Sequence, residues 1–270
     1  MELKNQIVIL TGASHGIGRA TAVVLAEAGY SLVLVARNQI PLQKLAQTLT
    51  QAGHRAVAIP TDMGDVAQVA GLVDKTIAIF GRIDIIINNA GIGVYSPLAT
   101  LGQTDAERVM AVNYFGPVAL IQATLPFLTA NQQGGQIINI SSIIGQRAMP
   151  NAAGYCASKA ALERMSESLR LELWTNNGSH IHVSTIYPGV TATDFVPRSL
   201  GNTAELPSNR MAGVPPERVA QAILRTIQTK KRDVFITSID WLFVTVSAVA
   251  PRLMDWLLFY YTRNRGGMKP

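Results

Sequence analysis

Two side chains four residues apart, Tyr155 and Lys159, are the pair in this sequence best suited to acid–base chemistry. Good helix formers surround them and continue to about Leu173, and residues four apart share one face of a helix. A phenol with its ordinary pKa of about 10 transfers protons poorly at neutral pH. Because a neighbouring ammonium group favours the phenolate, the spacing predicts a tyrosine whose pKa is lowered by a lysine.

Two serines, Ser141 and Ser142, follow the apolar run Ile137–Ile140, which has the composition of a buried strand. Ligands of α/β sheets bind at the carboxyl ends of the strands. A hydroxyl group at this place can therefore donate a hydrogen bond to the carbonyl oxygen of a ligand.

Three glycines, Gly12, Gly16 and Gly18, lie between a strand-like run at Ile7–Leu10 and a helix-like segment. Glycines in such a turn let the backbone approach a pyrophosphate closely. The N-terminus of the following helix then faces the phosphate charge with free N–H groups. Residues 11–18 therefore predict a dinucleotide site.

The same stretch also matches G-x-S-x-G, the nucleophile elbow of hydrolases, with Ser14 at its centre. That elbow needs an oxyanion-hole loop from an earlier strand, and Ser14 has only one strand before it. A hydrolase also needs an acid and then a histidine downstream, but His180 and His182 fall on an expected buried strand. The hydrolase interpretation is therefore disfavoured.

The choice of dinucleotide depends on the end of the second strand-like run, Leu32–Val35. Sites for NAD carry an acidic residue there for the ribose 2′-hydroxyl, but no Asp or Glu occurs from residue 28 to residue 61. Arg37 stands at this place, and its planar guanidinium group suits a 2′-phosphate. Ser14 and His15 could add contacts to the same phosphate, although a histidine anchors it more weakly than Lys or Arg. The sequence favours NADP(H) and leaves NAD(H) open.

Strand-like and helix-like segments alternate along the chain without a linker. This pattern predicts an α/β fold with a Rossmann-type, doubly wound parallel sheet of about seven strands. We expect one domain over residues 1–270, with a core at about 5–236 and a C-terminal apolar helical extension at about 237–270. The expected strands are Ile7–Leu10, Leu32–Val35, Val57–Ile59, Ile83–Ile87, Ile137–Ile140 and Ile181–Ile186. The expected helices are at 17–28, 41–53, 65–80, about 155–173 and about 217–228.

Together these motifs resemble those of the short-chain dehydrogenase/reductase family, over about residues 5–236. They occur in the family's order, as Thr11-Gly12-x-x-x-Gly16-Ile17-Gly18, Asn88-Asn89-Ala90-Gly91, Asn113, Ser142, Tyr155-x-x-x-Lys159, and Pro188-Gly189 followed by Thr193. The family places its serine thirteen residues before the tyrosine, which selects Ser142 over Ser141.

The resemblance implies a catalytic set of Ser142, Tyr155, Lys159 and Asn113. Tyr155 would donate a proton to the substrate oxygen, and Lys159 would lower the tyrosine pKa and bind the nicotinamide ribose. Ser142 would orient the carbonyl group, and Asn113 would hold a water molecule of the proton relay.

The resemblance also implies which residues bind the dinucleotide. Asp62 would contact the adenine, residues 89–91 would line the adenosine side, and residues 188–190 with Thr193 would hold the carboxamide. The full set is Gly12, Ser14, His15, Gly16, Ile17, Gly18, Arg37, Asp62, Met63, Asn89, Ala90, Gly91, Tyr155, Lys159, Pro188, Gly189, Val190 and Thr193.

The loop at 190–214 lies where the family places its substrate lid. The candidate wall residues of the substrate site are nearly all apolar, and they are Val94, Ile143, Ile144, Met149, Tyr187 and Phe195. Arg147 and Arg198 are exceptions that could meet an anionic group, but both are interpreted first as surface residues. The composition favours a lipophilic ketone, aldehyde or secondary alcohol over a small hydroxy acid.

The C-terminal region differs from the rest of the chain in composition. Residues 226–270 contain seven Lys or Arg and three Asp, so they carry +4 of the formal net charge of +6. The segment at 234–262 is mostly apolar, but its uncharged pieces are shorter than the about 20 residues that span a bilayer. An interfacial membrane contact is one interpretation, and packing on its own domain or on a second subunit is the other. The aromatic and basic residues that suit a membrane are Phe259, Tyr260, Tyr261, Arg263, Arg265 and Lys269.

Composition excludes several other classes of protein. Hydrophobic residues make up 48% of the chain, which excludes a disordered protein, and the single Cys156 excludes an internal disulfide or a cysteine-rich zinc module. No metal site and no nucleic-acid partner are expected. Because the first residues lack the apolar core of a signal peptide, we expect a cytoplasmic, non-secreted protein. We also expect it to form a homo-oligomer, a dimer or a tetramer.

These observations predict an NADP(H)-dependent oxidoreductase that reduces the carbonyl group of a lipophilic substrate, or oxidises the matching secondary alcohol. Two alternatives stay open. One is a reductase of a carrier-linked β-ketoacyl group, and the other is a dinucleotide-binding regulatory or scaffold protein without enzymatic activity. The complete set of Ser142, Tyr155 and Lys159 argues against the second alternative.

Overall fold

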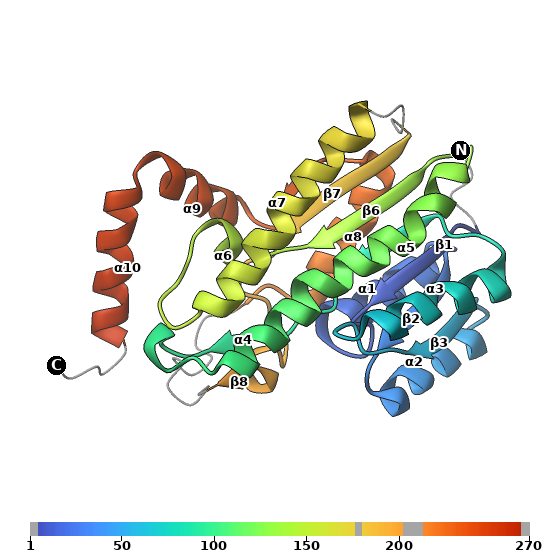
Figure 1. The fold of residues 1–270 in the computed structure, drawn as a ribbon, viewed down its shortest axis with the longest axis horizontal. Coiled ribbons are helices and arrows are strands. Elements are labelled where there is room, and N and C mark those ends of the chain that lie inside the picture. The colour runs from blue at the N-terminus through green and yellow to red at the C-terminus, as the bar shows by residue number, and fades with distance from the viewer. Residues whose placement is uncertain (1–4, 176–179, 202–212, 266–270) are drawn as a thin grey trace.

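Seven parallel strands form the central sheet of the computed structural model, which describes residues 5–175, 180–201 and 213–265 (Figure 1). The strands are β1 (Ile7–Thr11), β2 (Ser31–Ala36), β3 (Ala56–Pro60), β4 (Ile85–Asn88), β6 (Gly135–Ile140), β7 (Ile181–Tyr187) and β9 (Asp233–Phe235). They lie in the order β3-β2-β1-β4-β6-β7-β9, and every neighbouring pair is parallel. The doubly wound sheet of seven strands expected from the sequence is confirmed. Its order reverses between β1 and β4, so a ligand site is expected at the carboxyl ends of these strands.

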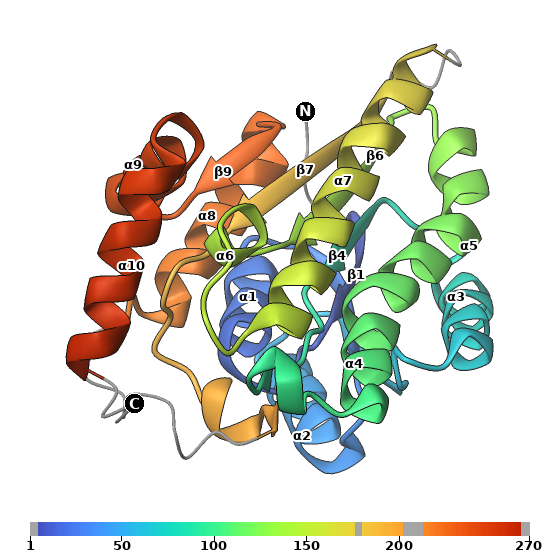
Figure 2. The ribbon, with the colours of Figure 1, turned by 60° about the vertical axis from the view of Figure 1, so that its left-hand side comes forward.

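Helices cover both faces of this sheet (Figure 1 and Figure 2). Buried apolar residues of α1, α2 and α8 belong to one hydrophobic cluster, and those of α3 and α5, with Leu169 of α7, belong to another. The helices of these two layers are α1 (Gly16–Glu27), α2 (Gln39–Gln51), α3 (Val66–Phe80), α5 (Gly116–Ala130), α7 (Ala153–Thr175) and α8 (Pro216–Thr229). Two shorter helices, α4 (Gln103–Met110) and α6 (Ile143–Gln146), lie near the carboxyl ends of the strands.

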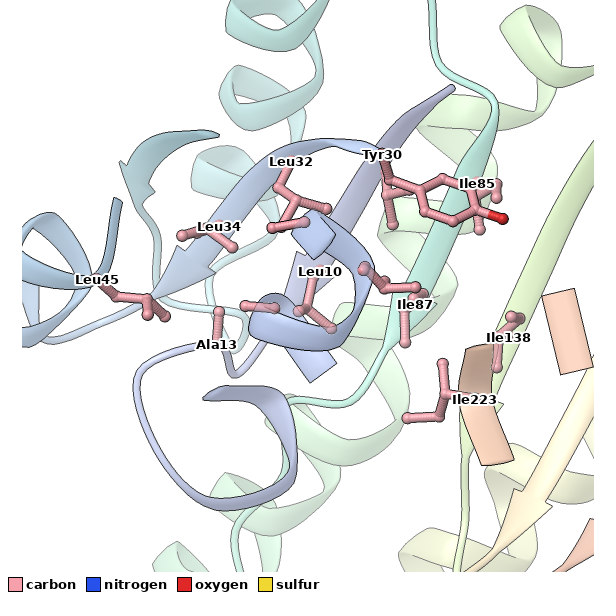
Figure 3. Close-up of a cluster of buried hydrophobic side chains, with 14 of the residues drawn as sticks. Leu10, Ala13, Tyr30, Leu32, Leu34, Leu45, Ile85, Ile87, Ile138 and Ile223 are labelled. Carbon is pink, nitrogen blue, oxygen red and sulfur yellow. The ribbon is translucent and has the colours of Figure 1, made fainter. Parts of the chain in front are cut away.

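Successive residues of each strand enter the two layers in turn, because strand side chains point alternately to opposite faces. Leu10 and Leu32 pack in the layer of α1, α2 and α8, which Figure 3 shows. Ile9 and Val33 pack in the other layer. All residues of β1 and β2 are buried, as in a parallel sheet that is covered on both faces.

Several boundaries differ by one or two residues from those that the sequence predicts. Helix α2 begins at Gln39, before Pro41, because proline is tolerated in the first turn, where no helical N–H bond is needed. Strand β9 was not among the strands located from the sequence, and it pairs with the end of β7.

The loop expected at 190–214 contains short elements. A 3₁₀ turn, η3 (Val196–Arg198), leads to strand β8 (Leu200–Gly201), which pairs in parallel with β5 (Val94–Tyr95). This pairing fastens the first part of the loop to the segment that follows β4. Residues 202–212 lie outside the described residues.

One helical run in the described part of the chain, Gln103–Ala130, is long and apolar enough to cross a membrane by length and composition alone. It comprises α4, the π-helical turn η2 (Ala111–Phe115) and α5. Helix α5 buries Leu120, Ile121 and Leu128 in the hydrophobic cluster beneath the sheet. In this fold the run therefore serves as a core helix.

The C-terminal extension consists of α9 (Ser238–Val249) and α10 (Pro251–Arg265), and this helical tail agrees with the sequence expectation. The two helices pass the same length and composition test only as a pair, and they are bent by 119° at the break. Pro251 stands at this break, where it prevents α9 from continuing. In both views α10 stands at the edge of the molecule beside α9 (Figure 1 and Figure 2).

A chain of buried polar side chains links the centre of the sheet to α7. The Asn88 amide donates to the Asn139 side-chain oxygen over 2.8 Å, and the Asn139 amide donates to the Ser166 hydroxyl over 2.7 Å. The Ser166 hydroxyl in turn donates to the Leu162 carbonyl within the helix. Because buried amides need partners, this chain fixes α7 relative to β4 and β6.

The variant Ser166→Ala should lower the free energy of unfolding by about 1–3 kcal/mol, because it leaves the buried Asn139 amide without its acceptor. Urea unfolding followed by circular dichroism measures the change. The matched control is Ser168→Ala on the exposed face of the same helix, which should change the free energy by less than about 0.5 kcal/mol. Equal effects of the two substitutions would contradict this role of Ser166.

Candidate active site

The loop between β1 and α1 brings backbone groups rather than side chains to the site. Gly12 has a φ of 69°, in the left-handed region, and a Cβ atom at this position would lie 2.8 Å from Ala90 Cα. A Cβ atom on Gly18 would collide with the Gly12 carbonyl oxygen. Both positions therefore require glycine. No side chain caps the N-terminus of α1, so its N–H groups are available to a phosphate.

Thr11 fastens this loop to the segment after β4. Its hydroxyl accepts hydrogen bonds from the N–H groups of Asn89 and Ala90 over 3.0 and 2.9 Å. Its carbonyl oxygen accepts from the Asn89 side-chain amide over 2.8 Å. The carboxyl ends of β1 and β4 are thus joined by hydrogen bonds, which place Asn89, Ala90 and Gly91 beside the glycine loop.

Asp62 lies where the resemblance places the adenosine of a dinucleotide, and it is held by Arg108. The guanidinium group donates to both carboxylate oxygens over 2.9 and 2.6 Å, and the N–H of Gly64 donates over 2.9 Å. Burial alone would raise the pKa of Asp62, but these hydrogen bonds and the charges of Arg108 and Arg37 hold it below its ordinary value. Asp62 therefore stays ionised. The sequence did not indicate Arg108, which lies 46 residues away along the chain.

His15 lies between the glycine loop and the loop after β7. Its Nδ1 is 2.8 Å from the Ser14 hydroxyl. Burial lowers the pKa of His15, and the charges of Arg198 and Arg19 lower it further, while Asp194 opposes them. His15 is therefore neutral at pH 7, and arginines supply the positive charge around it.

Helix α7 presents Tyr155 and Lys159 to one cavity, as their four-residue spacing predicts. The Lys159 ammonium donates to the Ile140 carbonyl over 2.8 Å and lies 5.8 Å from the centroid of the Tyr155 ring. Lys159 is only 4% exposed. Burial disfavours the charged form and lowers the pKa of Lys159 to about 8.

The pKa of Tyr155 is raised, whereas the sequence predicted that the lysine would lower it. Burial is the largest cause, and the neighbouring Tyr95 and Cys156 add to it. A hydrogen bond with the Ser142 hydroxyl acts in the opposite direction. The Lys159 ammonium is held by the Ile140 carbonyl instead of by the phenol. The phenol therefore stays protonated, which is the form that can donate a proton.

The two serines after β6 have different surroundings. Ser142 caps α6, lines the cavity and donates to the Pro188 carbonyl over 3.3 Å, in addition to its bond with Tyr155. Ser141 is buried and donates to the Lys159 carbonyl over 3.3 Å. The hydroxyl that meets the phenol is that of Ser142.

Asn113 lies in the π-helical turn η2 and is fully buried. Its side-chain oxygen accepts from the Ile92 N–H over 2.9 Å, and its amide donates to the Ile92 carbonyl and the Ser158 hydroxyl, each over 2.9 Å. Unlike the other catalytic residues that the resemblance implies, Asn113 does not line the cavity. π-Helical turns often mark functional sites, and this one carries a side chain that joins two walls of the site.

The segment after β7, where the resemblance places the nicotinamide, closes one side of the site. The Pro188 carbonyl accepts from the Ile143 N–H over 3.2 Å as well as from Ser142. The Thr193 methyl group would lie 3.0 Å from a Cβ atom on Gly16. This segment therefore lies against both the glycine loop and α6.

Four of the six wall residues expected for the substrate line the cavity, namely Ile143, Ile144, Met149 and Phe195. The Phe195 ring lies 5.4 Å from the Tyr155 ring, centroid to centroid, and the Tyr95 ring lies 6.3 Å from it. Burial raises the pKa of Tyr95 to about 12, so its hydroxyl stays protonated. Tyr95 was not expected from the sequence, although it adjoins Val94, which was.

The other two expected wall residues, Val94 and Tyr187, do not line the cavity. Val94 is buried behind the site with Val109. Tyr187 is buried on the sheet, where it stacks on Phe235 and its hydroxyl donates to Asp233 over 3.2 Å. Their side chains point away from the cavity because adjacent residues of a strand face opposite ways.

A cavity of about 1300 Å³ connects the glycine loop, the cavity-facing residues of α7 and the segment after β7. The glycine loop, Arg37 and Asp62 lie at one end, Tyr155 lies further along, and apolar side chains line the other end. Every residue that the resemblance implies for the dinucleotide lines this cavity. The cradle made by the glycines and the open helix N-terminus fit such a cofactor. The described residues contain no group of three or more His, Cys, Asp or Glu that could hold a metal ion.

Comparisons with known proteins agree with this geometry. A family model described as short chain dehydrogenase matches residues 6–202. The chain is 33% identical over 258 residues to an uncharacterized oxidoreductase of Bacillus subtilis, YxnA, which covers 95% of this chain and 72% of that relative.

Two solved structures are similar in fold. A short chain dehydrogenase/reductase from Burkholderia phymatum in complex with NAD has a TM-score of 0.85 at 23% identity and covers 100% of this chain and 99% of its own. An alcohol dehydrogenase from Thermococcus sibiricus complexed with 5-hydroxy-NADP has a TM-score of 0.76 at 26% identity and covers 86% of this chain and 96% of its own. With its sheet, its glycine loop and the matched residues 6–202, the chain belongs to the short-chain dehydrogenase/reductase family of oxidoreductases.

Proposed function

We propose that this protein is an NADP(H)-dependent oxidoreductase that reduces the carbonyl group of a lipophilic substrate, or oxidises the matching secondary alcohol. One observation carries the proposal: Ser142, Tyr155 and Lys159 meet in a cavity that has a dinucleotide cradle at one end and apolar walls at the other. A non-enzymatic scaffold has no need of these three polar groups around one point.

The chain's own residues would bind and protonate the substrate oxygen. The Tyr155 hydroxyl donates its proton to the carbonyl oxygen as negative charge develops there. The Ser142 hydroxyl donates a hydrogen bond to the same oxygen and so orients it. The Lys159 ammonium binds the ribose hydroxyls and stabilises the phenolate that remains after proton transfer. A bound nicotinamide supplies the hydride for the carbonyl carbon.

Asn113 acts in this proposal as a positioning residue. Its bonds to Ile92 and Ser158 hold the segment after β4 against α7. Its side-chain oxygen and the Lys159 ammonium would each lie 3.4 Å from a Cβ atom on Gly91, so both groups adjoin the same spot. This supports the water molecule that the family resemblance implies beside Lys159.

The charges at the adenosine end favour NADP(H) over NAD(H). Arg37 is exposed at the end of β2 and lines the cavity. The nearby carboxylate of Asp62 is already engaged by Arg108 and so does not offer a free acceptor to a ribose 2′-hydroxyl. A 2′-phosphate would find a guanidinium group there and no unpaired acid.

The apolar walls favour a lipophilic ketone, aldehyde or secondary alcohol. Around Tyr155 they consist of Ile143, Ile144, Met149 and Phe195, together with the aromatic ring of Tyr95. A carrier-linked β-ketoacyl group is the second candidate substrate, and comparing a β-ketoacyl thioester with simple ketones distinguishes the two.

We further propose that the protein is cytoplasmic, forms a homo-oligomer and makes peripheral contact with a membrane through α9 and α10. Large apolar side chains are exposed on α5 and α7, namely Phe127, Leu171 and Trp174, and they support a subunit contact there. Those on α9 and α10 form a second, separate surface.

The variant Tyr155→Phe should lower kcat by about 100-fold or more while leaving the Kd for NADPH nearly unchanged, because it removes only the proton donor. Steady-state rates at 340 nm and fluorescence titration with NADPH measure the two quantities. Tyr114→Phe, which removes a hydroxyl outside the cavity, is the control and should match the wild type. Retained turnover in Tyr155→Phe would rule out the proposed proton donor.

The variant Arg37→Asp should shift cofactor preference towards NADH by about 10- to 100-fold, because it removes the partner of the 2′-phosphate and adds an acceptor for a 2′-hydroxyl. The measurement is the ratio of kcat/KM for NADPH to that for NADH. Arg225→Asp on exposed α8 is the control for net charge. If both variants shift the ratio equally, Arg37 does not bind the 2′-phosphate of NADPH.

The buried ammonium of Lys159 should make stability depend on pH. Its pKa is about 8 in the folded chain and about 10.5 when unfolded, so the unfolded chain binds more protons between these values. The wild type should therefore gain up to about 3 kcal/mol of unfolding free energy, relative to Lys159→Met, as pH rises through this window. Denaturant titrations at pH 7 and pH 9.5 should show about 2 kcal/mol of this gain, because pH 9.5 lies about 1.5 units above the folded pKa. Parallel pH dependence in the two proteins would contradict a depressed lysine pKa.

A further inference from the structure

Helices α9 and α10 expose an unusual amount of apolar surface. They carry nine of the eighteen large hydrophobic side chains that are exposed in the described part of the chain. We call these nine residues the tail surface, and they are Ile239, Trp241, Leu242, Val249, Leu253, Trp256, Leu257, Phe259 and Tyr260. A concentration of exposed apolar residues of this kind marks an interaction site.

On α10 these residues follow the spacing of one helix face. Leu253, Trp256, Leu257 and Tyr260 stand at positions i, i+3, i+4 and i+7, which share a stripe. The Trp256 and Tyr260 rings stack at 5.8 Å, centroid to centroid, and this arrangement orders the stripe. All four are exposed, whereas Met254 turns inwards. The stripe therefore faces away from the body of the protein.

The acidic side chains of the tail are already engaged within the protein. Asp240 forms the capping box of α9 with Thr237. Asp255 pairs with Arg147 of the segment after α6. Asp233 accepts from Tyr187 and pairs with Arg232 over 2.8 Å. Each of these three carboxylates therefore already has a partner within the protein, an ion pair for Asp233 and Asp255 and a backbone hydrogen bond for Asp240.

The basic side chains of the tail are free by comparison. Arg252 and Arg263 of α10 are exposed, and neither forms an ion pair with any residue in the described ranges. Arg252 and Arg263 flank the apolar stripe of α10. The tail surface is thus apolar, aromatic and framed by unpaired positive charge, which suits a surface of anionic lipids.

A second copy of the chain fits this surface less well. A symmetric contact brings the same patch of each subunit together. Here it would set Arg252 and Arg263 of both subunits close to one another, while Asp255 is already paired with Arg147 and Asp240 is held in the capping box of α9. Tryptophan and tyrosine are also the residues that occupy membrane–water interfaces.

The tail adjoins segments that line the cavity. The Asp240 carboxylate lies against Gly189, where any Cβ atom would collide with it. The pair of Arg147 and Asp255 ties α10 to the segment between α6 and Met149, and Met149 lines the cavity. A membrane surface bound by α9 and α10 would therefore lie beside the cavity.

We propose that α9 and α10 dock on the surface of a bilayer that contains anionic lipids, and that the adjoining cavity receives substrates dissolved in that bilayer. The second clause rests on the proposed reductase function, whereas the docking does not.

Co-sedimentation of the full chain with vesicles tests the docking. Vesicles of phosphatidylcholine mixed with phosphatidylglycerol should bind the protein, and added salt should weaken binding because it screens the charges. Arg252→Glu and Arg263→Glu should each weaken binding at least about fivefold. Trp256→Ser and Ile239→Ser should weaken it comparably by removing inserted apolar area.

Two matched controls separate these effects from general ones. Ile40→Ser on α2 removes an isoleucine that is 78% exposed, against 77% for Ile239. Arg225→Glu reverses an exposed charge on α8. Both controls should bind vesicles as the wild type does, and thermal melting checks that every variant is folded.

Four outcomes would overturn the docking. The first is that the folded wild type does not bind vesicles, and the second is that it binds vesicles of phosphatidylcholine alone equally well. The third is that the tail variants bind like their controls. The fourth is that Trp256→Ser has a lower molar mass than the wild type by light scattering while neither protein binds vesicles. The last result would assign the surface to a second subunit.

Ketone reduction by the same samples without vesicles keeps the two proposals distinguishable. Vesicle binding without turnover would support the docking and refute the reductase function, whereas turnover without vesicle binding would do the reverse. With both present, Arg252→Glu should slow reduction of a vesicle-dissolved ketone and leave reduction of a water-soluble ketone unchanged. Equal rates of Arg252→Glu and wild type on the vesicle-dissolved ketone would overturn delivery from the bilayer.

Discussion

The buried ammonium group of Lys159 is the constraint around which the site is arranged. It has left water almost completely, which disfavours its charge, and its hydrogen bond to the Ile140 carbonyl offsets part of this cost. That bond can form only where the end of β6 meets the second turn of α7. The position of Tyr155, one turn earlier, follows from it. A lysine with a pKa of about 8 remains protonated at neutral pH. Its protonation is therefore sensitive to a change in the charge beside it.

The rest of the polar interior serves to hold α7 in this relation to the sheet. Ser166 bonds to Asn139 in the centre of the sheet, and Ser158 bonds to Asn113 in the π-helical turn. Ser141 donates to the backbone of Lys159 itself. Polar contacts therefore fix the helix at Ser158 and Lys159 and again about two turns later at Ser166, whereas apolar packing alone would leave it more freedom to slide. Apolar residues then set the character of the substrate end, where few polar groups compete for a ligand.

Much of the fold and of the site could be predicted from the sequence, because both depend on local signals. Runs of buried residues indicate parallel strands, and the glycine turn and the four-residue spacing keep their meaning in any fold of this type. Contacts between distant segments could not be predicted. Arg108 reaches Asp62 across 46 residues, and Tyr95 rather than Val94 faces the cavity because of the direction of a two-residue strand. The pKa of Tyr155 depends on the balance between burial and charge, which only the packed structure decides. The single-domain organisation and the residue roles stay predictions.

The proposed function requires that this site transfers hydride to a lipophilic carbonyl group. The most direct measurement is the absorbance at 340 nm of the purified full chain with a panel of lipophilic ketones and aldehydes, run with NADPH and NADH in parallel. We expect a loss of absorbance that depends on the presence of the ketone and is faster with NADPH than with NADH. Binding of NADPH without any absorbance change across the panel and the matching alcohols would contradict it and favour a dinucleotide-binding protein without enzymatic activity.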